Sequence, residues 1–400
     1  MLDNYINKLR FEMKVGLLLF LLAYSITSNA VVLQGDSRHQ VLSPTDPKAE
    51  KVGLLVVWNN DELSKKSGCS AANISSKYII TAAHCVIDPK TAKQYDNIVY
   101  YPKHVSQLTR SPSRVFIKKA YVHSDYLEAN KKQISDSNAG SNAYTTSMVE
   151  NNIAILEAFS DYSQKHVGTM YGWFDIAAVD DYLNNSNIVD VFLRSYPGEK
   201  DYGTLWYEAC LMKKDSDFTF VSCDTDPGTS GAAVTVMGEK DWQIIGVYSA
   251  SDTIRITNNV ALITPKIRLA LKAIFNGTNE NGSVFTKLNI STEPFYNFYI
   301  ENKCYKDIKV ALRLQKTDNS WETYESYQIR LNQRTLPAPD SNNTIYYYYA
   351  TTHDGTQWWG DKENGITKYA FGEERPFYRK VVPKNRPIRW GDYYRQVSCD

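Results

Sequence analysis

The stretch YIITAAHC, residues 78–85, decides the fold of this 400-residue chain. It begins as a short apolar run rich in β-branched and aromatic residues, which is typical of a strand, and it ends on a histidine and a cysteine. Similar runs of four to nine residues recur from residue 53 to residue 264, separated by turn residues. This spacing indicates an all-β sandwich or barrel and not βαβ units. The other runs are GLLVVW (53–58), NIVYY (97–101), RVFIKKAYV (114–122), NIAILEA (152–158), IVDVFLRSY (188–196), FTFVSC (218–223), AAVTVM (232–237), QIIGVY (243–248) and NNVALIT (258–264).

The composition is that of an ordinary folded protein. Apolar residues make up 43% of the chain and charged residues 22%, which excludes a collagen-like, low-complexity or wholly disordered chain. The 45 Lys and Arg residues nearly balance the 44 Asp and Glu residues, so the net charge is +1. No overall basic field would attract nucleic acid or anionic lipid, and we expect neither as a partner.

The N-terminal segment has the layout of a secretory signal. Lys8, Arg10 and Lys14 precede an apolar run at residues 15–24, and Ser28-Asn29-Ala30 offers a small-x-small cleavage site. The run is shorter than the ~20 residues that span a bilayer. We therefore expect residues 1–30 to be removed and the protein to be secreted or periplasmic, with an uncleaved anchor as the alternative.

Six cysteines in a secretory context predict disulfides. Six cysteines allow 15 pairings. Proximity in the chain favours Cys69–Cys85 and Cys210–Cys223, which leaves Cys304–Cys399. Because no C-x-x-C pair occurs, we expect no zinc site, and nothing in the sequence predicts a cofactor.

Two folded regions are expected from the order of these patterns. Residues 31–50 are polar and would form an arm or a short propeptide, and residues 51–275 hold the first domain, which closes on a helix at 266–275. The polar stretch 276–283 would be a linker and residues 284–400 a second β-rich domain. Residues 129–147 contain few apolar residues, so we expect a long surface loop there.

Two motifs of the first region carry chemistry. One is His84 at the end of the predicted strand, and the other is DPGTSGAAV, residues 226–234. A serine hydroxyl is a weak nucleophile unless a neighbouring imidazole takes its proton, and Ser230 and His84 could form such a pair. Glycines beside Ser230 allow a tight turn whose N–H groups, from Gly228 to Ser230, would face a developing oxyanion.

Together the two motifs resemble the trypsin-like, chymotrypsin-fold serine proteases over about residues 35–275. In that family TAAHC carries the general base and a G-x-S-G segment the nucleophile, and the fold is a pair of six-stranded β-barrels. The disulfide beside His84 also fits the resemblance. The segments 35–41, 52–54 and 258–261 are similar to the V8-like, glutamyl-endopeptidase branch. Thr229 stands where the trypsin branch has the Asp that binds a newly cleaved N-terminus, so the resemblance implies no activation by that ion pair.

The third member of the expected triad departs from the family pattern. Asn152 stands where the family has an Asp, which accepts the His Nδ1–H and stabilises the imidazolium. Three interpretations follow. The enzyme is slow, with His84 oriented by a neutral Asn; or Glu150, Asp125 or Asp161 substitutes for the missing acid; or the protein is a pseudoprotease that binds peptides.

The resemblance also gives candidates for the substrate pocket. An Asp at the position of Asp224 selects Lys or Arg in the trypsin branch. A Thr at the position of Thr225 selects Glu in the V8-like branch, together with a His on a later strand, but Tyr248 stands where that His is expected. Glu selectivity is therefore not supported, and Asp224 is also readily explained as a carboxylate at a strand end.

The second region resembles the DUF1036-type domain of secreted bacterial proteins. It carries NKCY (302–305), VALR (310–313), Trp321 and YYYA (347–350). We expect a small β-sandwich closed by Cys304–Cys399. Its tyrosines and tryptophans, including Tyr346–Tyr349 and Trp358-Trp359, would fill the core or form a platform for a glycan or peptide.

The sequence thus predicts a secreted serine endopeptidase that acts on protein, with His84, Asn152 and Ser230 at its centre. A non-catalytic relative that binds peptide in the same cleft is the first alternative. An adhesion protein that works through its C-terminal domain is the second.

Overall fold

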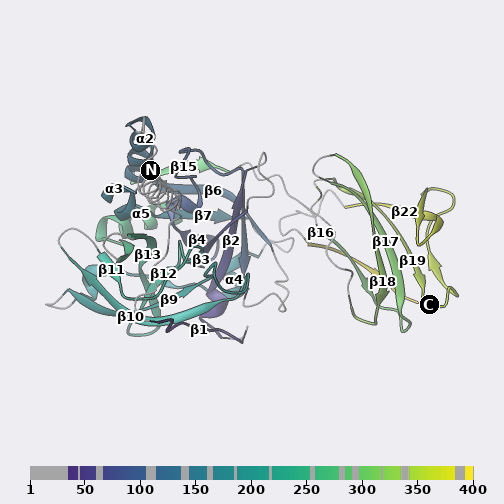
Figure 1. Cartoon of the computed structure of the whole chain (residues 1–400), viewed down its shortest axis with the longest axis horizontal. Helices are drawn as coiled ribbons and strands as arrows, with labels where there is room; N and C mark the ends of the chain where they lie inside the picture. The colour runs from purple at the N-terminus through teal and green to yellow at the C-terminus, as the bar shows by residue number, and fades with distance from the viewer. Residues whose placement is uncertain are drawn as a thin grey trace, which may run out of the picture.

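The computed structural model describes two β-rich domains, which lie side by side in Figure 1. No helix in the described part is long and apolar enough to cross a membrane. The expected signal segment, residues 1–30, lies outside the described residues. The structure describes residues 35–43, 46–59, 66–104, 114–136, 144–159, 165–183, 187–215, 219–252, 257–278, 284–290, 297–316, 319–333, 335, 341, 343–382 and 392–399.

A closed six-stranded barrel forms the first half of the N-terminal domain. Its order is β6-β5-β2-β3-β4-β7, all antiparallel, and β6 pairs with β7 to close it. Leu55, Ile79 and Ile155 are fully buried inside it. The strands are β2 (Val52–Trp58), β3 (Ser67–Asn73), β4 (Tyr78–Thr81), β5 (Asn97–Pro102), β6 (Val115–His123) and β7 (Ala154–Ala158).

The second half of this domain is another six-stranded barrel, which confirms the predicted pair. Its order is β10-β11-β14-β13-β12-β9, and β10 pairs with β9 to close it. The short strands β1 (His39–Gln40) and β8 (Asp175–Ile176) add to β10 and β13. The six strands are β9 (Ile188–Ser195), β10 (Trp206–Lys214), β11 (Thr219–Val221), β12 (Ala233–Met237), β13 (Trp242–Asp252) and β14 (Thr257–Leu262).

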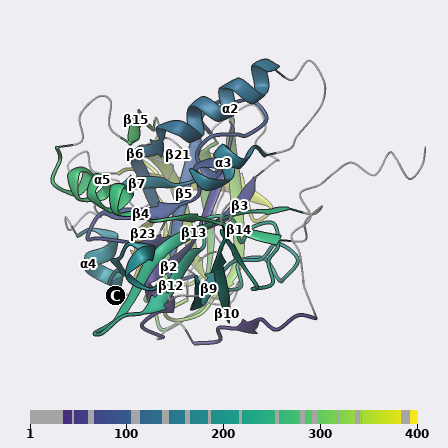
Figure 2. The same ribbon diagram turned by 90° about the vertical axis from the view of Figure 1, so that its left-hand side faces the viewer.

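Helices cover the outside of the two barrels. The predicted helix at 266–275 is confirmed as α5 (Pro265–Phe275), which Thr264 caps through the N–H of Ile267. The long loop predicted at 129–147 is wrong in part, because α2 (Ser124–Asp136) and α3 (Thr146–Glu150) occupy much of it. They lie next to each other in Figure 2. The other helical segments are α4 (Val167–Tyr171) and the short 3₁₀ turns η1 (Ala49–Lys51), η3 (Ala83–Cys85) and η4 (Val179–Asp181).

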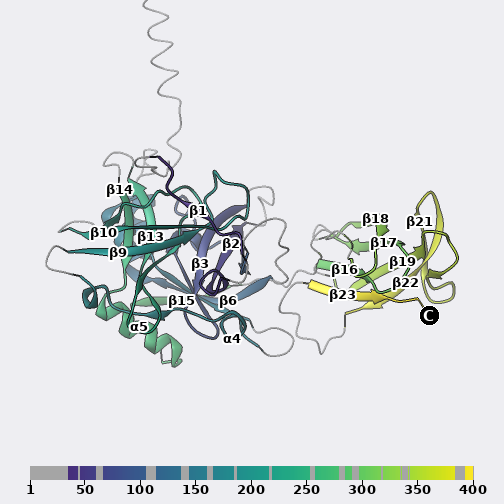
Figure 3. The same ribbon diagram turned by 90° about the horizontal axis from the view of Figure 1, so that it is seen from below.

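The strand that follows α5 belongs to the first domain. We expected residue 284 to begin the second domain, but β15 (Phe285–Asn289) pairs antiparallel with β6, at one edge of the first barrel in Figure 3. Phe285 is 2% exposed and packs in the core of that barrel. The described part of the C-terminal domain therefore starts at residue 297.

The C-terminal domain is the predicted small β-sandwich. β16 (Asn297–Asn302) and β23 (Asp392–Val397) form a parallel pair. Phe298 and Ile300 pack against Val310 and Leu312 of the larger sheet. That sheet has the order β18-β17-β19-β22-β21, with β20 beside β19, and contains β17 (Ile308–Gln315), β18 (Trp321–Ile329), β19 (Ile345–Thr352), β20 (Trp358–Trp359), β21 (Ile366–Ala370) and β22 (Glu373–Val381).

The run of four tyrosines in this domain packs largely into its interior. Tyr346, Tyr348 and Tyr349 are buried and Tyr347 is half-buried, while Trp358 is 44% exposed. The tyrosine run is thus part of the core. The three disulfides are the predicted ones, Cys69–Cys85, Cys210–Cys223 and Cys304–Cys399.

Candidate active site

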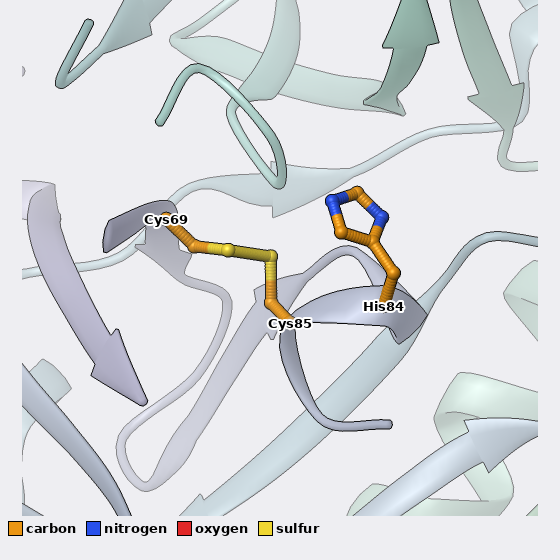
Figure 4. Close-up of side chains that lie close together, drawn as sticks. All are labelled: Cys69, His84 and Cys85. Atoms are coloured by element: carbon orange, nitrogen blue, oxygen red, sulfur yellow. A yellow bond between two sulfur atoms is a disulfide. The ribbon is translucent and has the colours of Figure 1, made fainter. Parts of the chain in front are cut away.

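His84 lies in the 3₁₀ turn η3, directly after β4. The Cys69–Cys85 disulfide ties this turn to β3, and Figure 4 shows the His84 ring beside the two sulfurs. A ring nitrogen of His84 and the two sulfur atoms all lie within 4.8 Å of one another. Because the sulfurs are bonded to each other, they are not available as thiolate ligands, and this group is not a metal site.

Ser230 lies on the other side of the same disulfide. Its carbonyl oxygen accepts a hydrogen bond from the Ser70 N–H at 2.7 Å and is 3.8 Å from Cys85 Sγ. Gly231 makes this approach possible, since it has a φ of +84° and a Cβ there would lie 2.2 Å from Thr81 Oγ1. The fold thus brings the Ser230 backbone to the disulfide next to His84, although the sequence separates the two residues by more than 140 positions.

The turn before Ser230 leaves two backbone donors unused. Thr229 N–H donates to the Asp226 carbonyl at 2.9 Å, and the Pro227 carbonyl accepts from Gly198 N–H at 2.6 Å. Within the described ranges, the N–H groups of Gly228 and Ser230 have no hydrogen-bond partner. They are the two donors that we expected to bind an oxyanion, and they are free to do so.

Asn152 is fully buried behind His84 and touches it twice. Its Oδ1 accepts the backbone N–H of His84 at 3.0 Å, and its Nδ2 lies 2.8 Å from His84 Nδ1. The same Nδ2 donates to Ser249 Oγ at 2.9 Å. Both hydrogens of the amide nitrogen and one lone pair of the amide oxygen are therefore used.

These contacts determine which way the amide points. Ser249 Oγ donates its own hydrogen to the Val149 carbonyl at 2.8 Å, so it can only accept from Asn152. If the amide were flipped, its NH₂ would face the N–H of His84, donor against donor. The NH₂ group therefore faces His84 Nδ1, which must accept. A neutral ring with Nδ1 as acceptor carries its proton on Nε2.

The surroundings of His84 favour the uncharged ring. Burial lowers the pKa of His84 to about 4. The ring of Tyr144 packs edge-on at 5.9 Å between centroids. In the described part of the chain, no carboxylate pairs with the His84 ring.

Of the three acids considered as substitutes for Asp, Glu150 and Asp125 make no hydrogen bond or ion pair with His84 in the described structure. Glu150 and Asp125 are exposed, and the charge of Asp125 acts on His123. Asp161 lies outside the described residues.

The three residues expected in the substrate pocket are all buried, but they make different contacts. Thr225 Oγ1 lies 2.9 Å from Tyr248 OH, and both hydroxyls bond to Asn258 Oδ1, at 2.8 and 3.4 Å. Burial raises the pKa of Tyr248 to about 12, so this cluster is uncharged. Asp224 instead accepts hydrogen bonds from the N–H and hydroxyl of Ser37 at 3.0 and 3.3 Å.

Several residues at the site were missed by the sequence reasoning. Ser249 orients Asn152, and Ser70 Oγ donates to the Gly228 carbonyl at 2.8 Å. Ser37 and Arg38 of the N-terminal arm contact the segment before Ser230. Ser249 follows the pocket residue Tyr248 directly and could have been suspected, whereas Ser70 and the arm have no local signal.

Comparison with known protein families gives one match. The family model described as Trypsin matches residues 55–271, more than half of the chain. No curated protein gives a sequence match. Among solved structures, a Glu endopeptidase in complex with MPD is 18% identical, with a TM-score of 0.46, and the match covers 62% of this chain and 100% of that one.

Two other solved structures are similar at a comparable level. Protease Anisep from Arthrobacter nicotinovorans is 12% identical, with a TM-score of 0.43, and the match covers 58% of this chain and 96% of that one. The thermostable serine protease AL20 from an extremophilic microorganism is 15% identical, with a TM-score of 0.41 and coverage of 58% and 97%. On the family match and the pair of closed barrels, the chain belongs to the trypsin family of serine proteases.

Proposed function

We propose that this protein is a secreted serine endopeptidase with a slow catalytic centre. Ser230 Oγ attacks the scissile carbonyl carbon while its proton passes to His84 Nε2. The carbonyl oxygen becomes an oxyanion held by the N–H groups of Gly228 and Ser230. His84 then gives the proton to the leaving amine, and water hydrolyses the acyl-enzyme by the same route. The unused N–H groups of Gly228 and Ser230 support this assignment.

The slow rate follows from one contact, the 2.8 Å between Asn152 Nδ2 and His84 Nδ1. Because the amide donates to Nδ1, the resting ring holds its proton on Nε2, the nitrogen that must accept the proton of Ser230. Reaction requires the other neutral tautomer, which places two N–H donors against each other. No carboxylate then stabilises the imidazolium that forms. The fully buried Asn152 has no space to turn away.

The substrate pocket of the proposed enzyme is neutral at its base. Thr225 and Tyr248 offer hydroxyl groups and no cation, so a Glu side chain would gain no ion pair there. The one acid among the three pocket candidates, Asp224, is engaged by Ser37. These contacts favour uncharged side chains on the substrate, and they make this chain an atypical relative of the V8-like branch.

Secretion rests on the N-terminal signal pattern and on the three disulfides, which form in oxidising compartments. For the C-terminal domain we propose a DUF1036-like module that binds a glycan or surface ligand. The exposed rings of Trp358, Tyr327 and Tyr369 are the available contact surface. No membrane association is expected after signal cleavage.

Labelling with a fluorophosphonate probe tests the proposed chemistry, since such probes phosphonylate only an activated serine. The wild-type chain should be labelled slowly, and mass spectrometry of the digested protein should place the adduct on Ser230. Ser230→Ala should abolish labelling. The exposed Ser147 lies near Asn151 on α3, and Ser147→Ala is the matched control that should leave labelling unchanged.

A second candidate function is peptide binding without catalysis in the same cleft. The orientation of the Asn152 amide favours it, because an inactive tautomer at rest has no cost to a protein that only binds. Absence of labelling in folded wild type and in folded Asn152→Asp would establish this reading and reject the endopeptidase. Labelling of the wild type at Ser230 would reject binding without catalysis.

A further inference from the structure

Arg38 is the most completely enclosed charged group near the candidate site. It belongs to the N-terminal arm, residues 35–43, and its side chain is only 2% exposed. Its Nε lies 2.7 Å from Asp36 Oδ1, its Nη1 lies 2.9 Å from Asp226 Oδ2, and its Nη2 pairs with Glu199. Three carboxylates from three separate segments thus surround one guanidinium.

Such an arrangement is stable only while all its members are present. A buried charge is tolerated where oppositely charged groups surround it. Without Arg38, Asp226 would lose its cation at a side chain that is only 12% exposed, whereas Asp36 and Glu199 would keep Lys200. Glu199 and Asp226 also contact each other through their side chains, so without the guanidinium their two charges would repel at close range. The position of Arg38 therefore determines the position of the two segments that carry these acids.

Those two segments meet at the oxyanion donors. Glu199 follows Gly198, and Asp226 precedes Pro227. The Gly198 N–H donates to the Pro227 carbonyl at 2.6 Å. The contact is tight, because a Cβ on Gly198 would lie 2.6 Å from that same oxygen.

This hydrogen bond orients the donor of Gly228. The peptide unit between Pro227 and Gly228 is planar and trans, so its N–H points away from its C=O. While the Pro227 carbonyl is held by Gly198, the Gly228 N–H faces the opposite side, where it has no partner among the described residues. A rotation of this peptide unit would remove one of the two oxyanion donors.

Thr229, the residue beside Ser230, carries no charge that could hold this segment in place. Thr229 is fully buried, and its Oγ1 accepts the N–H of Asp226 at 3.2 Å. Ser37, the neighbour of Arg38, bonds to Asp224 and Glu208, so the arm also holds the start of the same segment. Arg38 is a cation that contacts this segment, through Asp226.

We propose that Arg38 is a positioning residue that holds the Pro227–Gly228 peptide in the orientation needed for catalysis. The arm is then a permanent part of the working enzyme and not a propeptide to be removed. This inference rests on the proposed endopeptidase function. It adds that Arg38, a buried cation of the N-terminal arm, orients one of the two oxyanion donors.

The test compares Arg38→Gln with Arg38→Lys in the full chain. Arg38→Gln should lower the second-order rate constant for fluorophosphonate labelling by about 10²-fold, the usual effect of losing one oxyanion donor. Amide hydrogen exchange of residues 224–231 should become faster. Arg38→Lys keeps the charge but not the fork of donors, so it should recover part of the loss. The matched control is Lys51→Gln, which removes the Lys51–Asp241 ion pair of the same domain and should leave both readouts unchanged.

Two outcomes overturn the inference. One is a folded Arg38→Gln protein with wild-type labelling and wild-type exchange in residues 224–231. The other is an equal loss in Lys51→Gln, which would make the effect a general one of lost ion pairs. If Arg38→Gln does not fold, Asp226→Asn decides by the same criteria, because it breaks the contact while Arg38 keeps Asp36 and Glu199.

The exchange measurement separates this inference from the proposed function. If wild type is never labelled but Arg38→Gln still speeds exchange of residues 224–231, the endopeptidase fails while the positioning role stands. If wild type is labelled and Arg38→Gln changes neither the labelling rate nor the exchange rate, the endopeptidase stands while the positioning role of Arg38 fails.

Discussion

Replacing Asn152 by Asp should speed the labelling of Ser230 by about 10³–10⁴-fold. In the wild type, the amide of Asn152 donates to His84 Nδ1 at 2.8 Å and keeps the proton on Nε2. A carboxylate at residue 152 has only acceptors, so it would accept a hydrogen bond from Nδ1–H and leave Nε2 free to accept the proton of Ser230.

The magnitude follows from two terms at this contact. Reaching the active tautomer in the wild type breaks a buried hydrogen bond and leaves two donors facing each other, at about 1–3 kcal/mol. A negative charge about 4 Å from the imidazolium contributes about 4 kcal/mol at an effective dielectric constant near 20. Their sum is about 5–7 kcal/mol, and its lower end corresponds to the predicted 10³–10⁴-fold, since about 1.4 kcal/mol is a factor of ten. The reverse change in trypsin lowers kcat by about 10⁴, in agreement with this range.

The assay is the second-order rate constant for fluorophosphonate labelling of the purified mature chain at neutral pH. Asn151→Asp is the matched control. It adds the same charge one residue away, where the side chain bonds to the Ser147 carbonyl and not to His84. Asn151→Asp should label like the wild type.

An Asn152→Asp protein that is folded but labels no faster than the wild type would refute this reasoning. A wild type that already labels as fast as an ordinary trypsin-like enzyme would also refute it, because the tautomer with its proton on His84 Nε2 would then have no effect on the rate.

Three further predictions concern the same region. Only the neutral His84 ring accepts a proton, and burial lowers the pKa of His84 to about 4, so wild-type labelling should stay constant on acidification until about pH 5 and then fall. Asn152→Asp should raise the pKa of His84 and move this fall to higher pH. The pH–rate profiles of both proteins check this. Gly231→Ala should lower the free energy of unfolding by about 2–5 kcal/mol in chemical denaturation, because its Cβ would lie 2.2 Å from Thr81 Oγ1 at a φ of +84°. Gly277→Ala, at a φ of +74° with open space around it, should lower that free energy by only about 1–2 kcal/mol. Equal losses would contradict the steric explanation. Removing Cys69–Cys85, which spans 16 residues, should cost about 3 kcal/mol and slow labelling through displacement of His84, whereas removing Cys304–Cys399 in the other domain should leave the labelling rate unchanged.

Strands that contain β-branched and aromatic residues could be predicted from the sequence, because a pleated, half-buried surface selects such residues. All ten apolar runs of the first region lie on strands of the two barrels. The strand β3 reads SGCSAAN and was missed, because its small residues carry no strand signal. The helix α2 was missed because it buries only Tyr126 and Asn130 and so has no apolar stripe.

His84 and Ser230 could be predicted because each lies in a short motif with local turn chemistry. The orientation of the Asn152 amide could not, since it depends on Ser249 and the Val149 carbonyl, which only the folded barrels bring together. The same holds for Arg38, whose partner Asp226 is 188 residues away in the chain. A sequence shows which residues are present near a motif, but hydrogen-bond direction at a buried amide depends on every neighbour.

The most direct test of the account is the protonation state of the His84 ring nitrogens in the wild type, measured by ¹⁵N NMR on histidine-labelled protein. Comparison with a His84→Gln spectrum assigns the signals among the six histidines. The account predicts a proton on Nε2 and an unprotonated Nδ1 at neutral pH, and the reversed tautomer in Asn152→Asp. A wild-type ring with its proton on Nδ1 would contradict the claim that Asn152 holds this catalytic centre in its slow form.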